Sequence, residues 1–78
     1  MGKSQEMQVL EYLQRFGSIT PLEALNAYGI MRLSARIWRL RHAGHCIGME
    51  LIPVKNRVGE EVKVARYYLV NKEGNKNG

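Results

Sequence analysis

The chain of 78 residues has room for one small domain with a thin hydrophobic core, and leaves little chain for a catalytic cleft with a lid. Its hydrophobic fraction of 45% is too high for a disordered chain, and its single cysteine excludes an internal disulfide. No apolar run approaches the length of a membrane span, and the first residues lack the pattern of a signal peptide. We therefore expect a cytoplasmic, non-enzymatic domain whose net charge of +5 favours an anionic partner.

The positive charge is concentrated in two blocks of the sequence. Residues 32–42 carry four arginines and no acid, which gives +4. Residues 53–66 carry four basic and two acidic residues, which gives +2, and the rest of the chain carries −1. If the two blocks meet in the fold, they form a patch that attracts phosphate groups.

The first predicted element is an amphipathic helix between Ser4 and Gly17. Ser4 is suited to cap its start, Glu6 is favourable in its first turn, and Gly17 is a natural end. The apolar positions at helical spacing, with those that widen the face, are Met7, Val9, Leu10, Tyr12, Leu13 and Phe16. Residues 18–20 follow as a short extended link, in which Ile19 packs inward or adds a short strand.

A second, short helix is marked by a capping box. Thr20 is the expected N-cap, Pro21 occupies the first helical position, and Glu23 reaches back to the Thr20 backbone. Gly29 ends the helix because glycine readily adopts the left-handed conformation. The apolar face is expected to consist of Leu22 and Leu25.

The third predicted helix, residues 32–42, is the candidate functional element. Its core-facing stripe is Leu33, Ile37 and Leu40. The candidate DNA-contacting residues on its other faces are Arg32, Ser34, Ala35, Arg36, Trp38, Arg39 and His42. A short capped helix, a turn containing glycine and a longer amphipathic helix form the helix-turn-helix pattern, in which the second helix enters the major groove of DNA.

The arginines of this helix have competing interpretations. Arg32, Arg36 and Arg39 are interpreted as phosphate clamps or bidentate contacts to guanine. The alternative is solvated surface charge, or an ion pair within the molecule to Glu23 or Glu11.

Three further residues of the third helix stay open in the same way. Arg41 flanks the apolar stripe, so contact with DNA and an ion pair are equally compatible with its position. Ser34 either faces DNA or caps a helix that begins slightly later than residue 32. Trp38 lies away from the stripe, and either contacts a partner or folds against the hairpin that follows.

From His45 the apolar pattern changes from helical to alternating, which predicts a β-hairpin. Pro53 is expected to end the first strand, residues 54–61 to form a polar turn region, and residues 62–70 to form the second strand. The residues expected to pack inward on the helices are Ile47, Met49 and Leu51. Three helices followed by a C-terminal hairpin form an α+β fold, the winged helix-turn-helix, with the hairpin as the wing.

The wing, residues 53–61, is the second candidate site. Lys55, Asn56 and Arg57 at its tip are expected to reach a minor groove or the flanking phosphate backbone. Lys63 and Arg66 extend that line on the return strand. The alternative is a solubilising loop, since charged residues on strand edges also discourage aggregation.

No cofactor or metal is expected. His42, His45 and Cys46 lie close together in the sequence, but no second cluster completes a tetrahedral site. The chain also offers no Cys-His-Asp or Ser-His-Asp set for nucleophilic catalysis, and no small-molecule substrate is indicated. Residues 71–78 contain no apolar side chain and are predicted to be a disordered tail after a single domain over residues 4–70.

Several runs of the sequence resemble the small winged helix-turn-helix proteins encoded in phage and prophage genomes. The resemblance covers roughly residues 5–70. It is carried by Gly-Ser-Ile-Thr-Pro-Leu-Glu-Ala-Leu at 17–25, Tyr-Gly-Ile at 28–30, Arg-Leu-Ser-Ala-Arg-Ile at 32–37, Leu-Arg at 40–41 and Ala-Gly-His at 43–45. It implies a winged helix and contact with DNA, but supplies no operator, gene target or metal.

The sequence therefore predicts a protein that binds double-stranded DNA in a sequence-specific way, as a transcriptional regulator of a phage or prophage. Helix 32–42 is expected in the major groove and the wing on the backbone. One alternative is a winged helix that binds partner proteins and not DNA. Another is an architectural cofactor of recombination, similar to an excisionase, or of replication. A homodimer covering two half-sites is compatible with the sequence but not required by it.

Overall fold

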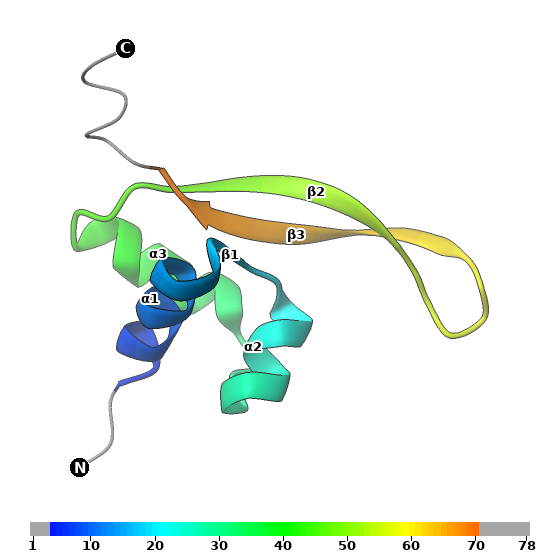
Figure 1. Ribbon diagram of the computed structural model, residues 1–78, viewed down its shortest axis with the longest axis horizontal. Helices are drawn as coiled ribbons and strands as arrows, with labels where there is room; N and C mark the ends of the chain where they lie inside the picture. The colour runs from blue at the N-terminus through cyan, green and yellow to red at the C-terminus, as the bar shows by residue number, and fades with distance from the viewer. Residues whose placement is uncertain (1–3, 71–78) are drawn as a thin grey trace.

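The computed structural model describes residues 4–70, and it shows three helices and a three-stranded antiparallel sheet (Figure 1). The elements in chain order are α1 (Gln5–Phe16), β1 (Ser18–Ile19), α2 (Pro21–Tyr28), α3 (Leu33–His42), β2 (Ile47–Lys55) and β3 (Glu61–Leu69). This is the α+β order predicted from the sequence, with a short β1 added between the first two helices. The disordered tail predicted for residues 71–78 lies outside the described residues.

Local signals set the ends of the first two helices as predicted. The Ser4 hydroxyl accepts a hydrogen bond from the Met7 amide at 3.2 Å, which caps the start of α1. At α2 both bonds of the capping box are present: the Thr20 hydroxyl accepts from the Glu23 amide at 3.2 Å, and the Thr20 amide donates to Glu23 Oε1 at 2.9 Å. Gly29 ends α2 with a φ of 72°, a conformation that side chains disfavour.

The core lies where the three helices meet the base of the sheet. Its buried residues are Val9, Leu13, Ile19, Ala24, Ile30, Leu33, Ile37, Leu40 and Ile47. The stripe predicted for the third helix is confirmed, and Ile19 is both buried and part of a strand.

The apolar faces predicted for α1 and α2 were partly wrong. Met7 and Phe16 of α1 are exposed, because its buried face is centred on Val9 and Leu13. In α2 the buried residue is Ala24, while Leu22 is 65% exposed and Leu25 is also exposed. A small side chain at the contact lets this short helix approach the core closely, and the two leucines face elsewhere.

The sheet has the order β1-β3-β2, so β3 is the central strand at its base. The short β1 pairs only with the end of β3, through Ser18 opposite Tyr68 and Ile19 opposite Tyr67. Beyond this point the sheet has two strands, and Figure 1 shows this hairpin extending past the helices.

The first strand of the hairpin does not end at Pro53, as the sequence suggested. It continues to Lys55, and Pro53 lies opposite Lys63 in the ladder. Proline is tolerated here because β2 is an edge strand, so one side of its backbone needs no ladder partner. The wing is therefore a longer hairpin with a shorter loop than predicted.

The prediction that three alternating residues of β2 pack inward was right for one of them. Ile47 is buried, but Met49 is 48% and Leu51 60% exposed. Ile52 and Val64, which pair on the opposite face, are half-buried. A two-stranded ribbon twists strongly, so a simple alternation does not keep one face on the helices along its whole length.

Candidate nucleic-acid interface

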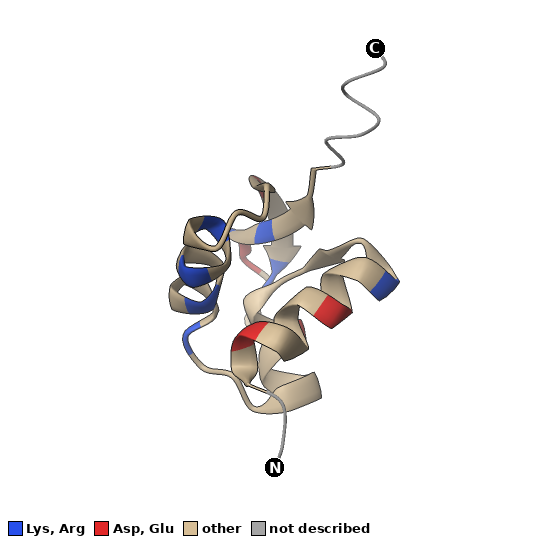
Figure 2. Cartoon of the chain, turned by 90° about the vertical axis from the view of Figure 1, so that its left-hand side faces the viewer, with Lys and Arg blue, Asp and Glu red and all other residues tan. Residues whose placement is uncertain are grey.

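Helix α3 presents one apolar face to the core and one polar face outward. Among its predicted contact residues, Arg32 precedes the first turn, and Ser34, Trp38, Arg39 and His42 are exposed. Ala35 and Arg36 are half-buried. Figure 2 shows the basic residues of α3 along one edge of the molecule and the acidic residues of α1 on the neighbouring helix. The helix therefore offers a cationic surface supplied by a single element.

Six of the predicted residues line one shallow depression on this surface. They are Arg32, Ser34, Ala35, Arg36, Trp38 and Arg39. Ser34 lies inside the first turn of the helix, because α3 begins at Leu33, so it is not the N-cap. Arg32 occupies the N-cap position, and its side chain makes no capping hydrogen bond. A guanidinium has only donors, so it cannot cap the amides at this end of the helix.

One carboxylate from α1 reaches the arginines of α3. Arg36 Nη1 donates to Glu6 Oε2 at 2.7 Å, and Arg39 Nε lies 3.6 Å from the same oxygen. Arg36 and, at the longer distance, Arg39 thus form the ion pair that was the alternative to DNA contact, but their partner is Glu6 and not Glu23 or Glu11. The Arg36 side chain is 26% exposed and that of Arg39 is 65% exposed. Arg39 therefore remains accessible to a ligand, whereas Arg36 is held against α1.

Trp38 stacks on His42, one turn later on the same helix. Their ring centroids are 3.8 Å apart with an interplanar angle of 32°, and Trp38 is 59% exposed. His42 Nδ1 lies 3.0 Å from the Trp38 carbonyl oxygen. The Trp38 ring thus contacts a ring of its own helix. The exposure of Trp38 rules out its burial under the hairpin.

Arg41 has a structural partner. Its Nε and Nη2 donate to the Ile47 carbonyl oxygen at 3.0 and 2.8 Å, which joins the end of α3 to the start of β2. No sequence pattern predicts this bond, because the acceptor is a backbone atom. Arg41 thus positions the hairpin relative to the helix.

The hairpin tip contains two exposed basic residues and one residue that builds the turn. Asn56 Oδ1 accepts hydrogen bonds from the amides of Val58 at 3.1 Å and Glu60 at 2.9 Å. Gly59, with a φ of 85°, donates its amide to the Asn56 carbonyl oxygen at 3.0 Å. Lys55 and Arg57 are exposed beside this turn. Asn56 therefore shapes the tip, and the two cations are available to a ligand.

On the return strand one of the two predicted basic residues is paired. Arg66 lies opposite Glu50, and its Nε donates to Glu50 Oε2 at 2.7 Å. Lys63 lies opposite Pro53 and is exposed. The line of positive charge along the hairpin is therefore shorter than predicted.

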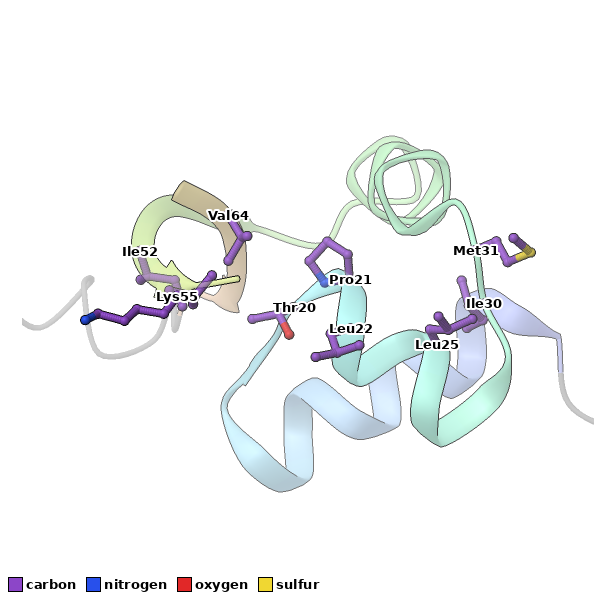
Figure 3. A pocket seen from close by; sticks show the side chains of 10 residues that line it. Thr20, Pro21, Leu22, Leu25, Ile30, Met31, Ile52, Lys55 and Val64 are labelled. Atoms are coloured by element: carbon purple, nitrogen blue, oxygen red, sulfur yellow. The ribbon is translucent and has the colours of Figure 1, made fainter. Parts of the chain in front are cut away.

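An apolar hollow of about 500 Å³ separates the hairpin from α2 and the turn that precedes α3. Its lining residues are Thr20, Pro21, Leu22, Leu25, Ile30, Met31, Ile52, Val54, Lys55 and Val64. Figure 3 shows Leu22 and Leu25 on the helical side, Ile52 and Val64 on the hairpin side, and the Lys55 amino group pointing away from the hollow. Sequence reasoning missed this hollow because it placed the leucines in the core.

The described part of the chain, residues 4–70, offers neither a metal centre nor a membrane span. No three His, Cys, Asp or Glu side chains in it are grouped so that they could hold a metal ion. No helix in the same part is long and apolar enough to cross a bilayer.

A helix-turn-helix that precedes a β-hairpin, with a cationic outer surface on its second helix, defines a winged helix-turn-helix protein. A family model described as a winged helix-turn-helix domain matches residues 4–72, and the chain belongs to this family. Domains of this kind are typically DNA-binding modules and not enzymes. No curated protein and no solved structure shows significant similarity to the chain. The predicted fold is thereby confirmed.

Proposed function

We propose that the protein binds double-stranded DNA, with α3 in the major groove and the hairpin on the adjacent backbone. The observation that carries the proposal is the outer surface of α3, where Arg32 and Arg39 flank the exposed Trp38 and no acid belongs to the helix itself. A helix with this surface provides donors for phosphate and for guanine. Membership of the winged helix-turn-helix family supports the same function.

The candidate residues divide by their contacts. Those we propose to touch DNA are Arg32, Ser34, Ala35, Trp38, Arg39 and His42 on α3, with Lys55 and Arg57 on the hairpin. We assign Arg36 and Asn56 supporting roles, because each is engaged in hydrogen bonds within the molecule. The resemblance to small phage proteins supports, as a finer proposal, a cytoplasmic transcriptional regulator in a phage or prophage.

Binding to duplex DNA over a range of salt concentrations tests the proposal. We expect a fluorescently labelled random duplex to bind at low salt, with log K falling linearly as log salt rises, by about 0.9 per phosphate contact. Arg39→Ala is expected to weaken binding to a selected site by about 1–3 kcal/mol if Arg39 contacts a base. If no salt-dependent binding is measured, the proposed function is wrong.

A second candidate function, a protein-interaction module, is favoured by the hollow between α2 and the hairpin. Leu22 and Met31 at this hollow are 65% and 83% exposed. Apolar side chains grouped at the surface in this way are typical of sites that bind a partner protein. A module of this class would show no salt-dependent affinity for duplex DNA. The DNA titration therefore separates the two functions.

Within the DNA-binding class, an architectural cofactor of recombination or replication is distinguished from a regulator by bending. An architectural protein deforms its site, and this changes the gel mobility of complexes according to the position of the site in the fragment. Mobility that does not depend on position supports the regulator.

A further inference from the structure

The exposed rings of Trp38 and His42 form a stacked pair on the outer surface of α3. The residues are four positions apart, which places them one above the other on the same helical face. The centroid separation of 3.8 Å means that the indole covers one side of the imidazole. Because both residues are exposed, the pair is accessible to any ligand that approaches this surface.

The hydrogen bond at His42 Nδ1 fixes the chemical character of the other ring nitrogen. Nδ1 lies 3.0 Å from the Trp38 carbonyl oxygen, which can only accept, so the hydrogen must be on Nδ1. In the neutral ring Nε2 then carries a lone pair and no hydrogen. Nε2 is thus a hydrogen-bond acceptor whose tautomer is set by the helix backbone.

An acceptor is unusual among the α3 side chains on this surface. The arginine side chains that share it have only donors, and the Trp38 indole N–H is also a donor. The Ser34 hydroxyl both donates and accepts, so it selects no base by itself. His42 Nε2 can therefore accept a hydrogen bond from DNA, which the arginines cannot do.

In the major groove, the hydrogen-bond donors on the bases are the exocyclic amino groups, N6 of adenine and N4 of cytosine. Guanine offers two acceptors there, and thymine an acceptor and a methyl group. We propose that His42 determines specificity by accepting a hydrogen bond from the amino group of an adenine or cytosine. This inference rests on the proposed DNA-binding function. Trp38 acts as a positioning residue that keeps the imidazole from turning away.

The test begins with selection of a binding site from a randomised duplex library at about pH 8. The selected site is then remade with purine in place of each adenine and 2-pyrimidinone in place of each cytosine, which removes only the amino group. At one position we expect the parent protein to lose about tenfold or more in affinity. His42→Ala should bind the two duplexes alike at that position.

Two further variants make the test specific to the acceptor and to the stacked pair. His42→Arg, which has donors only, should shift the preference at that position to guanine. Trp38→Ala should reduce the effect of amino-group removal, and Trp38→Phe should restore it. His45→Ala, which changes the other histidine beyond the end of α3, is the matched control and should keep the parent's preference.

The outcomes separate this inference from the function on which it rests. If the parent protein selects a site and His42→Ala keeps the same preference at every position, the assignment to His42 is wrong while DNA binding stands. If the parent protein binds no duplex, both are wrong. Circular dichroism confirms that each variant is folded, which we expect because both rings are exposed.

Discussion

Arg41 and Ile47 are joined by a forked contact, in which Nε and Nη2 of the guanidinium donate to a single carbonyl oxygen at 3.0 and 2.8 Å. Arg41 lies in the last turn of α3, and Ile47 is the first residue of β2. The contact therefore spans the connection between the helix and the hairpin. A hairpin that otherwise extends past the helices is held at its base by this bond and by the burial of Ile47.

Replacing Arg41 with alanine should affect both stability and the wing. We expect the free energy of unfolding to fall by about 1–2 kcal/mol, because a partly buried carbonyl loses a charged donor. Duplex affinity should also fall, since the hairpin is less firmly oriented. Urea unfolding and duplex titration measure the two effects. The control for charge is Arg15→Ala, which removes an exposed arginine of α1. Equal losses of duplex affinity in the two variants would contradict a positioning role for Arg41.

Replacing Glu6 with glutamine should strengthen binding to DNA. The carboxylate holds Arg36 at 2.7 Å and lies 3.6 Å from Arg39 Nε, so it competes with phosphate for both guanidiniums. We expect affinity for random duplex to rise by about two- to fivefold at low salt, and less at high salt because the effect is screened. The cost in stability should be at most about 1 kcal/mol, because the pair is partly exposed.

The control for Glu6→Gln is Glu50→Gln, which changes the net charge by the same amount on the hairpin. Glu50 is paired with Arg66 of β3, and the two line a depression with Gly17 and Ser18. If the two variants strengthen binding equally, net charge alone explains the result and the specific release of the α3 arginines is excluded.

The helix-turn-helix could be predicted from the sequence because its signals are local. The capping box at Thr20 and Glu23 involves residues three positions apart, and the α3 stripe repeats with the helical period. The ion pair of Arg36 with Glu6 joins residues thirty positions apart. This ion pair depends on how α1 packs against α3, and no local sequence pattern encodes that packing.

The hairpin shows a different limit of sequence reasoning. Alternation correctly predicted two strands, but assumed a flat ribbon, and the twist turned Met49 and Leu51 to solvent. The role of Asn56 had a readable signal, because asparagine three residues before glycine favours a turn closed by its own side chain. Recognising it would have separated Asn56 from the cations beside it.

Lys55 and Asn56 are neighbours with different expected effects. Lys55→Ala should weaken binding to all duplex sequences alike and reduce the salt slope by about one unit, since its exposed amine is suited to phosphate. Titration of a selected and a random duplex at several salt concentrations measures this. A loss confined to the selected site would mean that Lys55 contacts a base instead.

Asn56→Ala should act through stability. The side chain accepts two hydrogen bonds within the turn, so we expect the unfolding free energy to fall by about 1 kcal/mol. Asn56→Asp, which keeps the accepting oxygen, should largely restore it, as measured by thermal unfolding. The salt slope of Asn56→Ala should not change, because the asparagine side chain carries no charge, and a loss of duplex affinity without any loss of stability would show that Asn56 contacts DNA directly.

Two substitutions in α2 test which of its residues are in the core. Leu22 is 65% exposed, so Leu22→Gln should change the unfolding free energy by no more than about 0.5 kcal/mol. Ala24 is fully buried, so Ala24→Leu should cost about 1–3 kcal/mol because the added atoms overfill the contact between α2 and the core. Urea unfolding measures both. A larger loss of unfolding free energy in Leu22→Gln than in Ala24→Leu would mean that α2 turns its leucines toward the core, as the apolar pattern alone suggested. The hollow beside the hairpin would then be closed.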